Sequence, residues 1–138
     1  GVSIPYPKGS KGHSDGDVLF HAIVDAILGA LALGDIGEHF PSEDNRWENA
    51  NSKSFLKHTS NLMSDKGFSL GNLDATIILQ QPQLKNHIIE MRKNIASILH
   101  AEIDSISVKA TTTDEMGFTG RGSGIAATAV VLIHSHGN

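Results

Sequence analysis

The chain contains no cysteine among its 138 residues. This absence excludes disulfide bonds, zinc sites built on thiolates and cysteine nucleophiles, and it is compatible with a reducing compartment. Long apolar runs are also missing: Asp25 interrupts the longest one, well short of the ~20 residues that a membrane-spanning helix needs. The first residues lack the pattern of a signal peptide. The sequence therefore predicts a soluble protein.

Basic residues are few and scattered. The chain has 11 Lys and Arg residues against 15 Asp and Glu residues, for a net charge of −4. It has no basic cluster of the kind that binds a nucleic-acid backbone, so we expect neither nucleic acid nor a membrane as partner. Apolar residues make up 39% and charged residues 19%, which favours a folded chain over disorder. We expect one domain over residues 1–138.

Hydrophobic spacing predicts three helices, and β-branched content predicts four strands. In chain order these elements span residues 2–4, 17–33, 52–66, 73–79, 84–99, 106–110 and 125–133. The order β-α-α-β-α-β-β is typical of an α/β (α+β) domain with a mixed four-stranded sheet and helices layered on one face. The other face then needs a cover, and the small residues at 126–129 suit contact with a second subunit.

The segment at residues 13–21 is the densest group of chemically active side chains. Its residues 14–16 are turn formers, and Asp17 is suited to cap the helix that follows. Asp17, His21 and Asp25 recur every four residues, so they share one polar face of that helix. This face could bind a divalent cation, and the helix N-terminus favours an anion. The alternative is structural: a cap, and a histidine at the edge of the core.

A second group of polar residues follows the predicted strand at 106–110. Threonines at 111–113 offer hydroxyl and backbone N–H groups to phosphate oxygens. Arg121, between two glycines, could bind a phosphate with both arms of its guanidinium. The segment is neither a P-loop nor a dinucleotide fingerprint, because its glycines lead into a strand. The alternative is a glycine-rich hairpin connection.

Several short segments, spread over nearly the whole chain, are informative when they are taken together. They are residues 13–17 with His21, 34–37 with Phe40 and Pro41, 71–74 with 76–78, Pro82, and 109–124. In this order they resemble the 2-C-methyl-D-erythritol 2,4-cyclodiphosphate synthase family of the non-mevalonate isoprenoid pathway. The resemblance implies a cyclising phosphorus-oxygen lyase that converts 4-diphosphocytidyl-2-C-methyl-D-erythritol 2-phosphate to the cyclic diphosphate and CMP. It also implies a homotrimer with active sites between subunits, in a bacterial cytoplasm or a plastid stroma.

The resemblance further implies two kinds of metal ion. Zinc is expected on an Asp-x-His pair plus one more histidine, which His21 matches, and Mg²⁺ or Mn²⁺ is expected to bridge the substrate phosphates. The Asp-x-His pair belongs to the family's first strand, of which the chain carries only the end, so we expect further sequence upstream and an incomplete zinc site without it. His13 and Thr112 are the expected catalytic residues, which stabilise transferred charge. Our own hypothesis is that Asp17 or Asp25 orients His21.

The positions that the resemblance implies as substrate contacts serve the phosphates, the methylerythritol and the cytidine diphosphate. They are His13 and Ser14; Asp35, Ile36, Gly37, Phe40, Pro41, Ser42, Glu43 and Asp44; Leu79, Gln80, Gln81, Pro82, Gln83, Leu84 and Lys85; Thr111, Thr112, Thr113 and Asp114; and Phe118 and Arg121. Ser42, Gln83 and Asp114 depart from the acidic residue, lysine and glutamate that are usual in the family. These departures bear on binding, not on the reaction.

Two other functions compete with the lyase. One is a trimeric protein that binds a metal or an isoprenoid without turnover, and the other is a metal-dependent phosphohydrolase. The products separate them, because the lyase releases CMP, the phosphohydrolase releases inorganic phosphate, and the binding protein releases neither.

Overall fold

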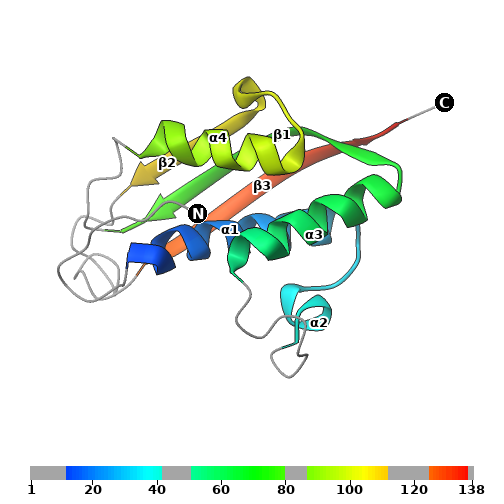
Figure 1. Ribbon diagram of the computed structural model, residues 1–138, viewed down its shortest axis with the longest axis horizontal. Coiled ribbons are helices and arrows are strands. Elements are labelled where there is room, and N and C mark those ends of the chain that lie inside the picture. The colour runs from blue at the N-terminus through cyan, green and yellow to red at the C-terminus, as the bar shows by residue number, and fades with distance from the viewer. Residues whose placement is uncertain (1–11, 42–50, 80–86, 112–124, 137–138) are drawn as a thin grey trace.

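The computed structural model describes residues 12–41, 51–79, 87–111 and 125–136 (Figure 1). In chain order the elements are α1 (Gly12–Ala30), α2 (Ile36–His39), α3 (Ser52–Asp65), β1 (Phe68–Ile78), α4 (Ile88–Leu99), the 3₁₀ turn η1 (Ile103–Ser105), β2 (Ile106–Thr111) and β3 (Ala126–Ser135). This is the predicted α+β architecture. The predicted first strand at 2–4 lies outside the described residues, and no helix within them is long and apolar enough to cross a membrane.

Strand β1 is the centre of a mixed sheet with the order β2-β1-β3. It pairs with β2 in parallel and with β3 in antiparallel register. Helix α4 joins β1 to β2, because parallel neighbours need a crossover connection. Ile78, the last residue of β1, lies opposite Thr111 of β2 and Ala126 of β3. The ends of β1 and β2 and the start of β3 therefore meet at one edge of the sheet.

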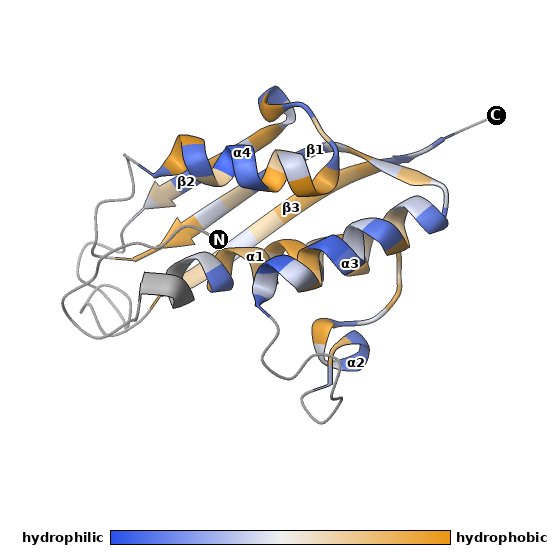
Figure 2. Ribbon diagram, viewed as in Figure 1, coloured by the Kyte–Doolittle hydropathy of each residue, from blue (hydrophilic) through white to orange (hydrophobic). Residues whose placement is uncertain are grey.

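The core lies between this sheet and helices α1, α3 and α4, which all cover the same face (Figure 1). Alternate residues of β1 are buried there, among them Leu73 and Ile77, as the period of a strand requires. From α1, Ile23 and Ile27 are fully buried at helical spacing. Helices α3 and α4 alternate between hydrophobic and hydrophilic stretches, as amphipathic helices do (Figure 2). The prediction of helices on one face is confirmed.

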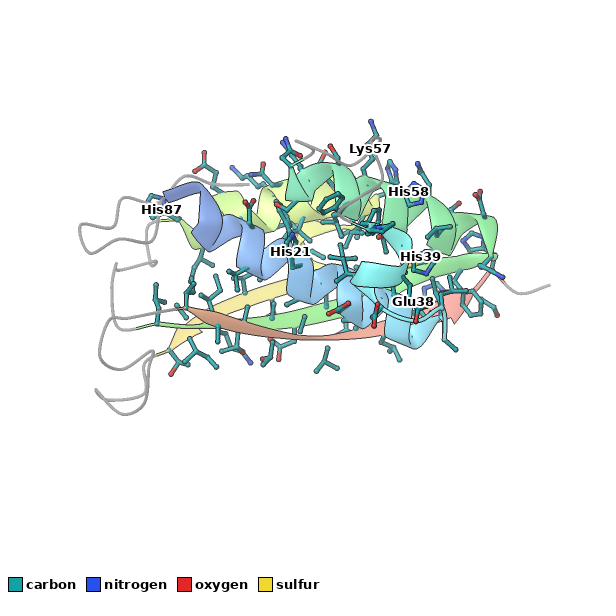
Figure 3. The ribbon with its side chains drawn as sticks, turned by 90° about the horizontal axis from the view of Figure 1, so that it is seen from below. His21, Glu38, His39, Lys57, His58 and His87 are labelled. Carbon is teal, nitrogen blue, oxygen red and sulfur yellow. The ribbon has the colours of Figure 1, made fainter. Side chains whose placement is uncertain are left out.

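The opposite face of the sheet has no helix over it in the described part of the chain (Figure 3). Val130 and Leu132 of β3 are 72% and 63% exposed on it. Beside them, the Lys109 Nζ lies 2.8 Å from the Asp74 Oδ2. This hydrogen bond from the Lys109 ammonium holds the pKa of the Asp74 carboxyl below its ordinary value. The open face thus combines an apolar strip on β3 with a charged pair on β1 and β2.

Helix α1 begins before the predicted start at residue 17. Its first residue is Gly12, so the turn formers at 14–16 belong to the helix. Gly16 is buried and Asp17 is half-buried, and Asp17 accepts a hydrogen bond from Ser52 of α3. Packing against other elements has overridden the local preference for a turn. The prediction that Asp17 caps the helix is wrong.

The helix also ends before its predicted last residue, 33. Ala32 adopts a left-handed backbone with φ 56°, and the Leu33 N–H donates to the Leu28 carbonyl at 2.9 Å. This hydrogen bond is the closing contact of a Schellman-type helix end. The left-handed cap, which we predicted at the glycines of residues 34–37, is therefore at Ala32 instead.

Strands β1 and β3 are both longer than predicted. β1 begins at Phe68 rather than at 73, and it contains an irregularity between Leu70 and Asn72. At that point a Cβ on Gly71 would lie 3.1 Å from the Leu132 carbonyl oxygen, so the close approach of β3 favours glycine over a larger residue. The pair Gly71-Asn72 resembles a turn in sequence, but it is a bulge within a strand.

Candidate active site

The polar face of α1 exists as its spacing predicted, but its two carboxylates bind other elements. The Asp17 Oδ1 accepts a 2.5 Å hydrogen bond from the Ser52 hydroxyl of α3. The Asp25 Oδ1 accepts the Ile36 N–H at 3.1 Å, at the start of α2. Among the described residues, neither carboxylate is hydrogen-bonded to His21. The structure thus gives both a role in joining helices and does not support the hypothesis that one of them orients His21.

Replacing Ser52 with alanine should lower the free energy of unfolding by about 1–3 kcal/mol. Ser52 is 3% exposed, so water cannot replace the hydrogen bond that the half-buried Asp17 carboxylate loses. Urea denaturation followed by circular dichroism measures the change. Ser64→Ala, at an exposed position of the same helix, is the control and should change stability little. Equal stability of the two variants would contradict the bracing role of the Ser52–Asp17 contact.

His21 is an exposed residue backed by aromatic rings. Its ring centroid lies 5.9 Å from that of Phe55, and Phe55 packs on Phe40 at 4.7 Å. Phe40 in turn meets the His58 ring edge-on at 5.4 Å. Figure 3 places His21 in the middle of α1, with His39 and His58 to one side of it. The cluster positions the imidazole while leaving it accessible, which suits a ligand better than a histidine at the edge of the core.

The described residues alone do not complete a metal site. Nowhere in the described ranges do three His, Asp or Glu side chains lie close enough together to hold an ion. A zinc site needs at least three protein ligands, and His21 supplies one. A zinc site that includes His21 would therefore need ligands from outside the described residues.

The strip predicted to line the methylerythritol pocket lies on and beside α2. Asp35 caps this helix, because its Oδ1 accepts the Glu38 N–H at 3.0 Å. Asp35 and Gly37 are exposed, whereas Phe40 is buried in the aromatic cluster. Helix α2 was not predicted, although an aspartate followed three residues later by a glutamate is a recognised helix-start pattern. Residues 42–44 of the strip lie outside the described residues.

The segments predicted to bind the cytidine diphosphate leave the sheet side by side. The Leu79 N–H donates to the Thr111 carbonyl at 3.0 Å, which extends the β1–β2 ladder to its edge. Helix α1 begins on this side of the molecule as well (Figure 1). The rest of these segments, residues 80–85 and 112–114, is outside the described ranges, as are Phe118, Arg121 and the side chains of His13 and Ser14.

Among the described residues, the predicted substrate contacts do not all lie together within one chain. Helix α1 has 19 residues and, at ~1.5 Å per residue, it is roughly 28 Å long. Helix α2 lies near the C-terminal end of α1, to which Asp25 links it, whereas the strand ends lie at the N-terminal side (Figures 1 and 3). The described substrate contacts therefore form two groups: one at α2, which includes Asp35 and Phe40, and one at the strand ends, with Leu79 and Thr111.

Comparison with known proteins gives a consistent result. The YgbB family model matches residues 1–134. The chain is 60% identical to the 2-C-methyl-D-erythritol 2,4-cyclodiphosphate synthase of Geobacter metallireducens and 59% identical to that of Alkaliphilus oremlandii. Each alignment covers 133 residues, which are 96% of this chain and 85% of the relative.

Solved structures agree with the sequence comparison. The bifunctional IspDF from Campylobacter jejuni matches with a TM-score of 0.88 and 45% identity, over 98% of this chain and 37% of that longer chain. A CDP complex of IspF from Plasmodium falciparum matches with a TM-score of 0.78 and 36% identity, over 91% of this chain and 75% of that chain. These matches define the chain as an α+β domain of the YgbB type.

The chain belongs to the YgbB family, the family of the 2-C-methyl-D-erythritol 2,4-cyclodiphosphate synthases that it matches. The resemblance stated from the sequence is thereby confirmed.

Proposed function

We propose that the chain is a cyclising lyase that converts 4-diphosphocytidyl-2-C-methyl-D-erythritol 2-phosphate to 2-C-methyl-D-erythritol 2,4-cyclodiphosphate and CMP. The observation that carries this proposal is identity of 60% to a synthase of this name over 96% of the chain. The two similar synthases come from bacteria, so we place the reaction in a bacterial cytoplasm, in the supply of isoprenoid precursors.

The geometry of the strand ends supports a nucleotide site. Ligands of open α/β sheets bind beyond the carboxyl ends of the strands, and Leu79 and Thr111 leave adjacent parallel strands at that edge. The similar Plasmodium falciparum protein was solved as a CDP complex. We therefore assign residues 79–85 and 111–114 to the cytidine diphosphate, with Phe118 and Arg121 as further contacts.

The reaction is an intramolecular phosphoryl transfer. An oxygen of the 2-phosphate attacks the β-phosphorus of the diphosphate, and the bond from that phosphorus to the oxygen of the α-phosphate breaks. The released electron pair leaves on CMP. Because the nucleophile is already an anion, the site needs positioning and charge neutralisation rather than a strong base. His13 and Thr112 have the role of stabilising the transferred charge, and the N-terminal end of α1 adds its positive dipole.

His21 is the zinc ligand that the described residues offer. Its exposed imidazole, held against Phe55 at 5.9 Å, supports this assignment. Zinc held by His21 would act as a Lewis acid that neutralises charge on a substrate phosphate, and Mg²⁺ or Mn²⁺ would neutralise charge on the diphosphate. Asp35, Ile36 and Gly37, with residues 40–44, would then line the methylerythritol pocket.

A homotrimer with sites between neighbouring subunits accounts for two features of the single chain. First, the apolar strip of Val130 and Leu132 on the open sheet face needs a cover. Second, the group of predicted contacts around α2 and the group at the strand ends lie far apart in one chain. A neighbouring copy can bring its strand ends to the α2 group, so that one substrate touches both.

Incubation of the full-length protein with the cytidylated 2-phosphate substrate tests this function. We expect release of CMP together with the cyclic diphosphate, loss of both after chelation, and recovery on addition of a divalent metal. Release of inorganic phosphate instead would identify a phosphohydrolase. Metal binding without any product would identify a binding protein, and either result would overturn the proposal.

A further inference from the structure

An open cavity of about 440 Å³ lies between the first turns of α3 and the C-terminal end of α4. Its lining includes Asn51, Lys53, Lys57, Ser97, Ile98 and His100. None of these residues belongs to the predicted substrate contacts. No carboxylate appears in the lining that the described residues form.

Lys53 and Lys57 give the cavity a positive charge that the described residues do not compensate. They lie one turn apart on α3, so they share a face and repel each other. Within the described ranges neither forms an ion pair, unlike Lys109, whose ammonium is 2.8 Å from Asp74. Lys57 projects from the side of α3 that faces away from the sheet (Figure 3). In a chain with net charge −4, such a pair of ammonium groups favours an anion.

The other polar lining groups are suited to donate hydrogen bonds. The Asn51 Oδ1 already accepts from the Ser54 N–H at 3.0 Å and from its hydroxyl at 3.2 Å. The Asn51 amide therefore has only its NH₂ group to offer a ligand. Ser97 adds a hydroxyl, and His100 ends α4 in a left-handed conformation, with φ 56°. Donors thus come to the cavity from both helices.

We propose that this cavity binds a phosphate-bearing small molecule at a site distinct from the predicted active site. Ammonium groups and neutral donors are the groups that hold phosphate oxygens in proteins. The volume lies within the range of small-molecule sites, and Ile98 offers an apolar wall to the carbon part of the ligand. The proposal does not depend on the proposed lyase reaction.

Amide chemical shifts of the full-length protein, titrated with inorganic phosphate and separately with ribose 5-phosphate, test the proposal. We expect saturable shifts at Ser54, Lys57 and Ser97. The double variant Lys53→Gln/Lys57→Gln should weaken binding at least tenfold and leave CMP release unchanged. The control Lys66→Gln/Lys93→Gln removes the same charge from exposed positions at the end of α3 and on α4, and it should leave binding unchanged.

Tighter binding of ribose 5-phosphate than of inorganic phosphate would identify a phosphorylated organic ligand, and the reverse order would identify the free anion; both support the site. Absence of saturable shifts at these amides would overturn the proposal. So would equal weakening in the control variant, since binding would then follow net charge alone. If the unaltered protein releases no CMP, the lyase assignment is wrong, but the proposal of a phosphate site in this cavity is unaffected.

Discussion

Replacement of Thr112 with alanine should lower the rate of CMP release by about 100-fold or more, the effect of removing one donor to a transition-state oxyanion. The folded structure and the assembly should survive, because residues 109–111 before it are exposed at the end of β2. Steady-state CMP release measures the rate. Thermal unfolding and sedimentation of the same sample measure fold and assembly.

Thr112→Ser is the matched control, since it keeps the hydroxyl and removes only a methyl group. It should retain most of the turnover. Full turnover in Thr112→Ala would contradict the assigned role. Equal losses in the alanine and serine variants would show that the side chain acts through its shape and not through its hydroxyl.

Replacement of His21 with alanine should abolish zinc retention and lower turnover by about 100-fold or more, because loss of even an outer partner of a metal ligand commonly costs 10- to 100-fold. His21 is exposed, and its ring is tilted by 37° against that of Phe55 at 5.9 Å, so the fold should persist. Metal content after dialysis, by atomic emission, and CMP release are the two measurements.

His100→Asn is the matched control for His21. His100 has a positive φ of 56°, a conformation that asparagine tolerates, and it lies outside the predicted active site. This variant should keep both zinc and turnover. If His21→Ala keeps its full zinc content and only its thermal stability falls, His21 is not a zinc ligand and has a structural role instead.

Hydrophobic spacing correctly predicted those elements whose buried residues recur at the regular spacing of a helix or a strand. Helix α3 begins at Ser52 and ends at Asp65, against predicted bounds of 52 and 66, and Leu56 and Met63 are buried as expected. β2 begins at Ile106 as predicted. In these segments local preference and tertiary packing favour the same structure, so a sequence pattern is sufficient.

The misplaced boundaries lie where packing opposes local preference. Gly16 favours a turn by itself, yet it is buried inside α1. Helix α1 ends at Ala30, before the predicted residue 33, and Ala32 adopts the left-handed conformation that a sequence pattern assigns to glycine. The hydrogen bond that closes this helix end runs from the Leu33 N–H to the Leu28 carbonyl, and hydrophobic spacing does not reveal which residue adopts the left-handed conformation.

The part of the candidate site that depends on local spacing was predictable, and the part that depends on contacts between distant elements was not. The shared face of Asp17, His21 and Asp25 follows from helical spacing alone. Their partners, Ser52 and Ile36, come from other elements, so neither contact could be predicted. The separation of α2 from the strand ends is likewise a property of the whole fold, and it is one of the features on which we base the proposal of a site shared between copies.

The edge where β1 and β2 end has a consequence for how members of this family can diverge. Main-chain hydrogen bonds, such as that from the Leu79 N–H to the Thr111 carbonyl, fix the points where the segments that we propose to bind the nucleotide leave the sheet. Such bonds do not depend on side-chain identity. If the proposed nucleotide contacts are correct, changes such as Gln83 or Asp114 would alter affinity for the base and the diphosphate while the points at which their segments leave the sheet stay in place.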